Sequence, residues 1–253
     1  MIGAAEVEVV QQVLRRCAAI VLPAGMEYVV EGRLEQLART SGYANIHDVL
    51  VALRSQAFGD LHRRLVEAFA VNETSFFRDG RPFELLRTDV IPRLIERGRT
   101  ALSVWSAAAA SGQEAYSVAI LVRDHFPELA RHTTIVASDI SRPMLTRIDA
   151  GTYSSFELRR GLDRAQIARH FVSDGRDFRV RPELRAMLDI RELNLVKPWP
   201  TLPTFDIVLL RNVLVYFEPP TRREVLRRVR ATMARDAELF VGATENLLAE
   251  GTR

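Results

Sequence analysis

The chain has 253 residues, of which 47% are hydrophobic and 26% are charged, and its formal net charge is +3 at pH 7. These values are typical of a globular protein with a substantial core, and so weak a positive charge gives little support to nucleic-acid binding. The single cysteine, Cys17, excludes internal disulfides and a cysteine-cluster metal site, and we expect no bound metal.

The N-terminus carries no basic region followed by an apolar run, which argues against a signal peptide. The longest uncharged apolar stretch near it, residues 17–26, is too short to cross a bilayer. We therefore expect a cytoplasmic protein, monomeric and not inserted into a membrane. Its positive charge is almost entirely arginine, which suits the recognition of carboxylates, so an acidic protein surface is as good a partner as a nucleic acid.

Residues 6–70 show the spacing of apolar side chains that is typical of consecutive amphipathic helices. Asn45 is suited to cap the third of these helices, with Asp48 in its first turn. No alternation typical of strands is present, so we predict an all-α N-terminal domain over residues 1–71. The apolar stripes are Val10, Val13, Leu14, Cys17 and Val21; Val30, Leu34, Leu37 and Ala38; and Phe58, Leu61, Leu65, Val66 and Phe69.

Residues 71–79 combine alternating polar side chains with two adjacent phenylalanines, between two helical patterns. We expect the two rings to anchor this segment against the following domain. Asn72, Thr74 and Arg78 would then be held in fixed positions, as a binding site requires.

A helix is predicted from Pro82 to Arg97, because proline is favourable in the first turn and Gly98 ends the pattern. Pro92 lies inside this helix, and we expect it to introduce a kink.

Residues 102–122 read as a buried strand, a turn of small residues and an amphipathic helix, the first unit of a doubly wound α/β sheet. The turn has one glycine, Gly112, and lacks the glycine fingerprint of a pyrophosphate site. Glu114, in the first turn of the helix, would repel a phosphate but suits an ammonium, a sulfonium or ribose hydroxyls. The pattern favours S-adenosylmethionine over a dinucleotide, and a packing turn without a ligand is the alternative.

A second buried strand, residues 134–140, carries Asp139 near its end. In nucleoside-binding α/β folds an acid at this place binds the ribose hydroxyls. A carboxylate that only caps the next helix is the alternative.

The later part of the chain departs from a simple α/β alternation. Residues 169–196 contain three short alternating runs, the last over 187–190, which we interpret as a small antiparallel insert. A third buried strand, 205–210, leads directly into Arg211 and Asn212, which places both at the ligand edge of the sheet. A basic helix follows from Pro219, and residues 239–245 are predicted to form a fourth strand.

Five motifs occur in one order: Asn-Glu-Thr-x-Phe-Phe-Arg, Ser-Ala-x-x-x-Ser-Gly-Gln-Glu-x-Tyr-Ser, Ala-Ser-Asp-Ile, Asn-Leu, and Arg-Asn-Val-Leu-x-Tyr-Phe. In this the chain resembles the chemotaxis receptor methyltransferases, the CheR family, over residues 1–248. The resemblance implies a class I methyltransferase fold, doubly wound and Rossmann-like, over 72–253. It also implies an activity, the methyl esterification of glutamate side chains on chemoreceptors with S-adenosylmethionine, which leaves S-adenosylhomocysteine.

The resemblance also implies site residues. The positions that match the family's cofactor-binding residues are Asn72, Thr74, Arg78, Glu114, Asp139, Asn194, Leu195, Arg211 and Asn212. Arg78 and Arg211 are candidates to orient a carboxylate, either the cofactor's or the substrate's. Tyr216 is a third catalytic candidate that would line the substrate side, with a packing role as the alternative.

The chain departs from the family pattern in three places. Leu210 stands where the family has cysteine, which reads as a neutral buried exchange. Residues 242–245 read Gly-Ala-Thr-Glu where the family has Gly-His-Ser-Glu, so the histidine is absent and Glu245 remains. The family continues through an antiparallel hairpin that completes a seven-stranded sheet, whereas this sequence ends at Arg253 without it.

Two other functions are consistent with parts of the sequence. A nucleic-acid methyltransferase would explain the arginines, but the Asn/Asp-Pro-Pro-aromatic motif and a cysteine nucleophile are missing after the third strand. A weakly active or non-catalytic S-adenosylmethionine-binding module for signalling is the second alternative.

The expected partner is the cytoplasmic helical region of a chemoreceptor or a similar methyl-accepting protein. Family members that grip a C-terminal pentapeptide tether carry a longer glycine-rich turn in the insert, whereas here the turn over 172–177 has one glycine. We therefore expect direct, tether-independent contact, with Arg176, Arg179 and Arg181 facing acidic helices, and a purely solvating role for these arginines as the alternative.

Overall fold

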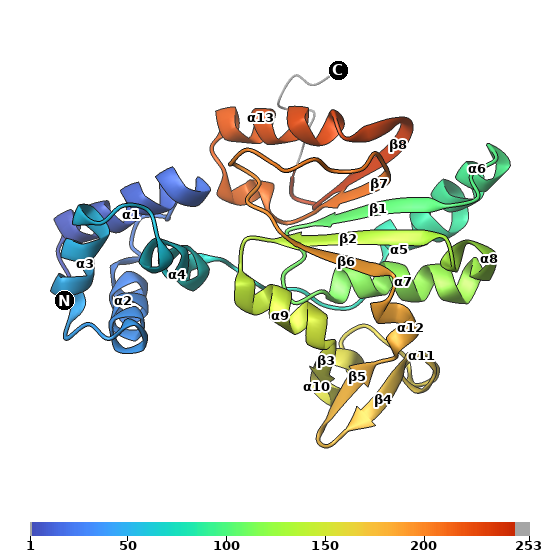
Figure 1. Cartoon of the computed structure of the whole chain (residues 1–253), viewed down its shortest axis with the longest axis horizontal. Helices are drawn as coiled ribbons and strands as arrows, with labels where there is room; N and C mark the ends of the chain where they lie inside the picture. The colour runs from blue at the N-terminus through green and yellow to red at the C-terminus, as the bar shows by residue number, and fades with distance from the viewer. Residues whose placement is uncertain (1, 246–253) are drawn as a thin grey trace. The chain divides into compact units, whose positions relative to one another are not determined.

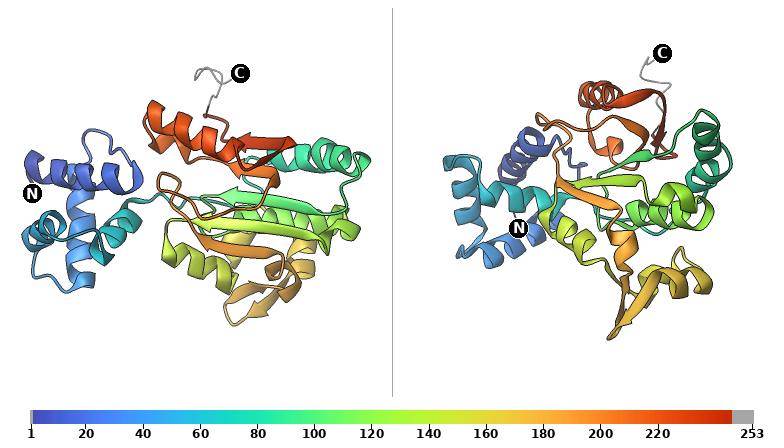
Figure 2. Two further views of the ribbon diagram at one scale, coloured as in Figure 1. Left: turned by 45° about the horizontal axis from the view of Figure 1, so that its top comes forward. Right: turned by 45° about the vertical axis from the view of Figure 1, so that its right-hand side comes forward.

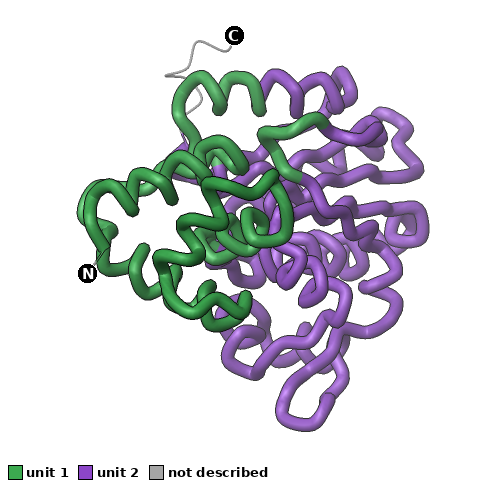
Figure 3. The backbone as a smooth tube through the Cα atoms, turned by 60° about the vertical axis from the view of Figure 1, so that its left-hand side comes forward, with its two compact units in different colours: residues 1–71, 194–198, 214–225 green, residues 72–193, 199–213, 226–253 purple. Residues whose placement is uncertain are grey.

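The computed structural model describes residues 2–245, which form two compact units (Figure 3). The first unit comprises the described part of residues 1–71 together with 194–198 and 214–225, and the second comprises 72–193, 199–213 and the described part of 226–253. The sequence analysis assigns 194–198 and 214–225 to the second domain. They cluster with the first because Asn194 Nδ2 donates to Cys17 O and Val21 N donates to Tyr216 O.

The first unit is built on four helices. Asn45 caps the third as predicted, since its Oδ1 accepts the N–H of Asp48 at 3.0 Å. Phe58 is an exception to the predicted stripes: it is 56% exposed, because the fourth helix begins only at Asp60. The helices are α1 (Ala4–Ala18), α2 (Glu27–Ser41), α3 (Ile46–Ser55) and α4 (Asp60–Phe69).

The second unit contains a five-stranded parallel sheet in the order β6-β2-β1-β7-β8, which Figures 1 and 2 show from three directions. The three inner strands are almost entirely buried, as expected for a parallel sheet covered by helices on both faces. This confirms the doubly wound α/β fold. The strands are β1 (Leu102–Ala107), β2 (Thr133–Asp139), β6 (Leu188–Glu192), β7 (Phe205–Leu210) and β8 (Met233–Val241).

Helices precede and connect these strands along the chain. The larger are α7 (Gln113–His125), α9 (Arg142–Ala150) and α13 (Pro219–Arg230); the short ones are α5 (Arg81–Leu85), α6 (Ile91–Glu96) and α8 (Pro127–Ala130). A π-helical turn, Leu86–Val90, separates α5 from α6. Pro92 follows this turn by two residues, and since a proline ring clashes with the carbonyl one turn earlier, an irregular helix is expected at this place.

The two edge strands differ from their predictions. Residues 187–190 were assigned to the antiparallel insert, but β6 pairs in parallel with β2, with Leu188 opposite Ile135. A half-exposed edge strand alternates in the same way as a hairpin strand, so the pattern alone does not separate them. β8 begins at Met233, six residues before the predicted start. The prediction missed these residues because they include the polar side chains of Asp236 and Glu238, which form ion pairs with arginines on or near α6.

A separate three-stranded antiparallel sheet has the order β3-β5-β4 (Figure 1). One of its strands, β3, lies earlier in the chain than the predicted insert, so the antiparallel region begins before residue 169. A two-residue turn joins β4 and β5, since Asp174 pairs with Asp177. The elements are β3 (Thr152–Ser154), β4 (Phe171–Asp174) and β5 (Asp177–Val180), with α10 (Ser155–Arg159), α11 (Arg164–His170) and α12 (Pro182–Arg185).

The segment before α5 is anchored on this small sheet. The ring of Phe76 is 1% exposed and meets Tyr153 and Phe171 edge to face, at centroid distances of 5.0 and 5.7 Å. Phe77 packs in the same way on Phe83 at 5.1 Å. The predicted anchoring of this segment by its two rings is thereby confirmed. A Cβ on Gly161 would lie 1.9 Å from the carbonyl oxygen of Phe76, so only glycine fits there.

The contact at Gly161 gives a test of this anchoring. Gly161→Ala forces the new Cβ against a backbone carbonyl, and we expect it to lower the free energy of unfolding by about 3 kcal/mol. Urea unfolding followed by circular dichroism measures the change. Gly32→Ala, in helix α2 with nothing within 4 Å of the new Cβ, is the control and should stabilise by about 0.5–1 kcal/mol. Equal effects of both substitutions would contradict the steric account.

Candidate functional site

The site is built where the parallel strands end, because the carboxyl ends of β1, β2 and β7 meet at one edge of the sheet. After β1 the chain turns through left-handed conformations at Ala108 and Ala110, with φ of 56° and 48°. Such angles are unfavourable for alanine and need support from the surroundings. Ser138 O accepts the N–H of Ala109 at 2.9 Å and Asp139 Oδ2 accepts that of Ala110 at 2.8 Å, which holds the turn.

Asp139 is buried at the end of β2, where the sequence predicts an acid. Its second oxygen, Oδ1, accepts the N–H of Ser141 at 2.9 Å, so the carboxylate holds the turns on both sides of the sheet edge. Burial raises the pKa of the Asp139 carboxyl, and hydrogen bonds from Ser141 and Ala110 oppose the shift. Each carboxylate oxygen can still accept a further hydrogen bond, for example from a hydroxyl.

Glu114 lies in a buried ionic cluster. Its Oε1 accepts the hydroxyl of Ser106 at 2.8 Å, and its Oε2 lies 2.9 Å from Nη1 of Arg211. Arg211 also donates through Nη2 to Asp79 at 2.6 Å and to the carbonyl of Arg78 at 3.0 Å. Burial raises the pKa of the Glu114 carboxyl, and the positive charge of Arg211 opposes this shift.

The two candidate arginines differ in their contacts. The Arg211 side chain is 1% exposed, and its guanidinium lies 5.8 Å from the ring of Phe83. Both Nη atoms of Arg211 are bound within the protein, to Glu114, Asp79 and the carbonyl of Arg78. Arg78 is half-buried, donates through Nη1 to the carbonyl of Glu73 at 2.7 Å, and forms no ion pair with any described residue.

The remaining predicted residues fall into two groups. Asn72 and Thr74 are half-buried in the anchored segment, and neither side chain makes a hydrogen bond within residues 2–245. Asn212 follows Arg211 in a left-handed conformation, with φ of 59°. Asn194, Leu195 and Tyr216 belong to the other compact unit, so their place in the site stays a prediction.

Sequence reasoning missed Asp79 and Ser106. Asp79 directly follows the motif that ends in Arg78, and its φ of 67° is one that aspartate tolerates better than most residues. Its contact with Arg211 spans 132 residues of sequence, so no local pattern indicates it. Ser106 lies on β1 and is fully buried, and a serine near the end of a buried strand is the signal that was available.

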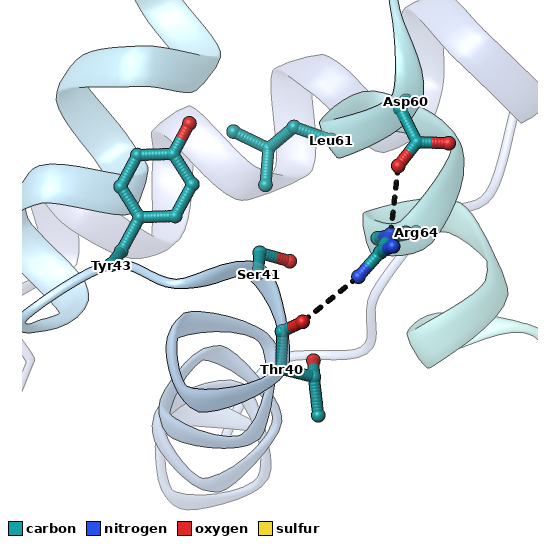
Figure 4. A pocket seen from close by; sticks show the side chains of 6 residues that line it. All are labelled: Thr40, Ser41, Tyr43, Asp60, Leu61 and Arg64. Atoms are coloured by element: carbon teal, nitrogen blue, oxygen red, sulfur yellow. Dashed lines mark hydrogen bonds and ion pairs between the residues drawn. The ribbon is translucent and has the colours of Figure 1, made fainter.

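The helical unit has a small pocket of about 210 Å³, lined by Thr40, Ser41, Tyr43, Asp60, Leu61 and Arg64 (Figure 4). Arg64 bridges its two sides, with Nε 2.8 Å from Asp60 and Nη1 3.0 Å from the carbonyl of Thr40. None of the lining residues is a predicted site residue, so the pocket is not part of the candidate site.

The described residues contain no group of three or more histidine, cysteine, aspartate or glutamate side chains arranged to hold a metal. None of the helices over 2–245 is long and apolar enough to span a membrane. The chemistry at the sheet edge fits S-adenosylmethionine. Two buried acids suit its ribose hydroxyls and ammonium group, and no glycine-rich phosphate cradle is present in the turn after β1. Which acid takes which group is left open.

A doubly wound parallel sheet that presents buried carboxylates at its carboxyl edge defines the chain as a class I S-adenosylmethionine-dependent methyltransferase. The family model "CheR methyltransferase, SAM binding domain" matches residues 72–253. The protein belongs to the CheR methyltransferase family.

Curated relatives agree with this assignment. The chain is 35% identical over 240 residues to the chemotaxis protein methyltransferase Cher2 of Pseudomonas putida, covering 92% of this chain and 87% of that protein. It is 35% identical over 249 residues to chemotaxis protein methyltransferase 1 of Pseudomonas aeruginosa, covering 96% and 90%. It is 34% identical over 233 residues to chemotaxis protein methyltransferase 1 of Vibrio cholerae, covering 90% and 84%.

Glu114→Gln tests the ionic cluster. A glutamine can still accept from Arg211 and donate to Ser106, but the buried Arg211 loses one of its two charged partners, so we expect the melting temperature to fall. Binding of S-adenosylhomocysteine should weaken about tenfold to a hundredfold, because a charge-assisted hydrogen bond is lost.

Calorimetric titration measures this affinity. Glu157→Gln is a matched control, since Glu157 also pairs with an arginine, Arg147, and a serine, Ser154, but in the small antiparallel region. Unchanged affinity in Glu114→Gln would remove Glu114 from the cofactor site.

Proposed function

We propose that the protein transfers the methyl group of S-adenosylmethionine to glutamate carboxylates of cytoplasmic chemoreceptor helices, forming glutamyl methyl esters for sensory adaptation. The observation that carries this proposal is the closed cluster of Glu114, Arg211 and Asp79. It leaves Arg78, on the anchored segment next to that cluster, as the cation available for an incoming carboxylate. The chemotaxis methyltransferases among the relatives support the choice of substrate.

The chemistry needs no general base. A glutamate with an ordinary pKa of about 4.3 is already ionised at neutral pH, so its oxygen attacks without losing a proton. The cofactor supplies a methyl group on a sulfonium: the new carbon–oxygen bond forms as the carbon–sulfur bond breaks, and its electron pair leaves with sulfur. Opposite charges disappear in this step, so excluding water favours it.

The residues then act chiefly by alignment. Arg78 orients the substrate carboxylate, and Arg211 acts through Glu114 by fixing its position. Asp139 holds the turn after β1 and, in this proposal, binds the cofactor as well. Tyr216 lines the substrate side. A Ser-His-Asp or Cys-His arrangement has no role, since the nucleophile belongs to the substrate.

We further propose that the protein contacts receptor helices directly, without a C-terminal peptide tether. The compact turn between β4 and β5 supports this, because Asp174 and Asp177 close it around only Gly175 and Arg176. Arg179 is 58% exposed even though its Nη2 lies 2.6 Å from Asp174. Arg181 donates to the carbonyl of Arg169 at 2.8 Å. Arg176 and Arg179 are therefore the better candidates to face an acidic helix, and salt should weaken that attraction.

The nature of the product distinguishes this function from its alternatives. Incubation with receptor-bearing membranes and methyl-labelled cofactor should give label that mild alkali releases as methanol, because esters hydrolyse and N-methyl groups do not. Membranes without receptors are the control. Alkali-stable label would exclude the ester, and the absence of transfer by a protein that binds S-adenosylhomocysteine would favour a non-catalytic signalling module.

Removal of the receptor's C-terminal tail tests the direct contact. Initial rates of methylation should be the same with the intact receptor and with the receptor lacking its tail. The isolated C-terminal pentapeptide should show no binding at micromolar concentrations. Activity that disappears with the tail would refute the tether-independent mode while leaving the esterification unaffected.

A further inference from the structure

The end of β8 carries a buried acid whose contacts the site described so far does not use. Glu245 follows β8 by four residues and is 7% exposed. Its Oε2 accepts two backbone N–H groups, from Asn212 at 2.8 Å and from Gly242 at 2.7 Å. Gly242 directly follows β8 and Asn212 follows β7 by two residues; the last ladder pair of these strands is Leu210 with Val241. The carboxylate therefore joins the two strand ends where the β ladder stops.

The joined conformation is one that asparagine adopts more readily than most residues but less readily than glycine. Asn212 has a φ of 59°, in the left-handed region that costs free energy for residues other than glycine. A buried backbone N–H needs a partner, and Glu245 supplies it for Asn212. Arg211, the neighbouring residue, is thereby held where its guanidinium reaches both Glu114 and Asp79.

Gly242 is part of the same arrangement. A Cβ at this position would lie 2.7 Å from Oε2 of Glu245, 2.8 Å from Nδ2 of Asn212 and 3.0 Å from the N atom of Asn212. The glycine therefore allows the strand end, the amide and the carboxylate to approach one another. An alanine there would push Asn212 or Glu245 away, because two of the three neighbouring atoms belong to Asn212.

We propose that Glu245 is a positioning residue for S-adenosylmethionine: it holds Asn212 and, through the chain, Arg211 in the geometry that binds the cofactor. The role rests on the proposal that Asn212 belongs to the cofactor site, and it is independent of the methyl acceptor. Because the carboxylate binds backbone N–H groups, an uncharged oxygen acceptor of the same shape performs the same task. The charge of Glu245 itself is not required.

The test compares Glu245→Ala and Gly242→Ala with Glu245→Gln in the full chain. In the two alanine variants we expect the dissociation constant for S-adenosylhomocysteine to rise about tenfold, as for the loss of one to two hydrogen bonds. KM for S-adenosylmethionine should rise by a similar factor, with kcat at saturating cofactor unchanged. Glu245→Gln keeps an acceptor oxygen and should bind as the wild type does. Glu238→Ala, an acid on β8 that pairs with Arg93, is the matched control and should also bind normally.

A double-mutant cycle keeps the proposal testable if the single variants are unstable. Asn212→Gly removes the cost of the left-handed conformation, so Glu245→Ala should weaken cofactor binding less in that background than in the wild type. Additive losses would overturn the proposal. So would a melting temperature that falls in Glu245→Ala without any change in affinity, or a Glu245→Gln variant that binds as weakly as the alanine variant. Calorimetry needs no receptor, so a wrong methyl acceptor would leave these results interpretable.

Discussion

The organisation of the site depends on one buried guanidinium. Arg211 lies between Glu114 and Asp79, which brings together residues from the end of β7, the first turn of α7 and the segment before α5. The side chains of Arg211 and Glu114 are 1% and 12% exposed, whereas that of Asp79 is 44% exposed; a buried charge is costly unless it keeps its partner. The position of each acid is therefore tied to that of the arginine, and the arginine's position is tied to the end of β7. These ion pairs fix the positions of the three segments relative to one another.

The sequence is informative about the middle of this fold and less so about its edges. The inner strands β1, β2 and β7 are continuous apolar runs, so their position and the acids at their ends follow from simple rules. β6 and β8 are edge strands with one exposed side. From the sequence, β6 is therefore interpreted as a strand of the antiparallel insert, and the polar first part of β8 is not recognised as a strand. The contacts of Asp79 and Glu245 join residues far apart in sequence, which no local spacing predicts. Roles inferred from motif position, such as those of Asn194 and Tyr216, remain predictions.

The small antiparallel sheet also supports two parts of the candidate site through packed side chains. Tyr153 and Phe171 hold the ring of Phe76, and Tyr153 also donates its hydroxyl to the carbonyl of Ser111 in the turn after β1 at 2.7 Å. The segment with Asn72 and Arg78 and the turn next to Glu114 thus share one buried aromatic support. A change in this sheet reaches both through packed side chains.

The two tryptophans of the chain contact each other, Trp105 from β1 and Trp199 from the segment before β7. Trp105, on β1, donates to Ser138 Oγ at 2.9 Å and meets Trp199 edge to face at a centroid distance of 5.3 Å. Both belong to the second unit, whereas the helical unit contains no tryptophan. Tryptophan fluorescence, excited selectively, consequently reports on the sheet next to Ser106 and Asp139 and not on the helical unit, whose aromatic emission comes from tyrosines such as Tyr28 and Tyr43. If the helical unit melts on its own, that transition will show in the helical ellipticity and not in the tryptophan emission.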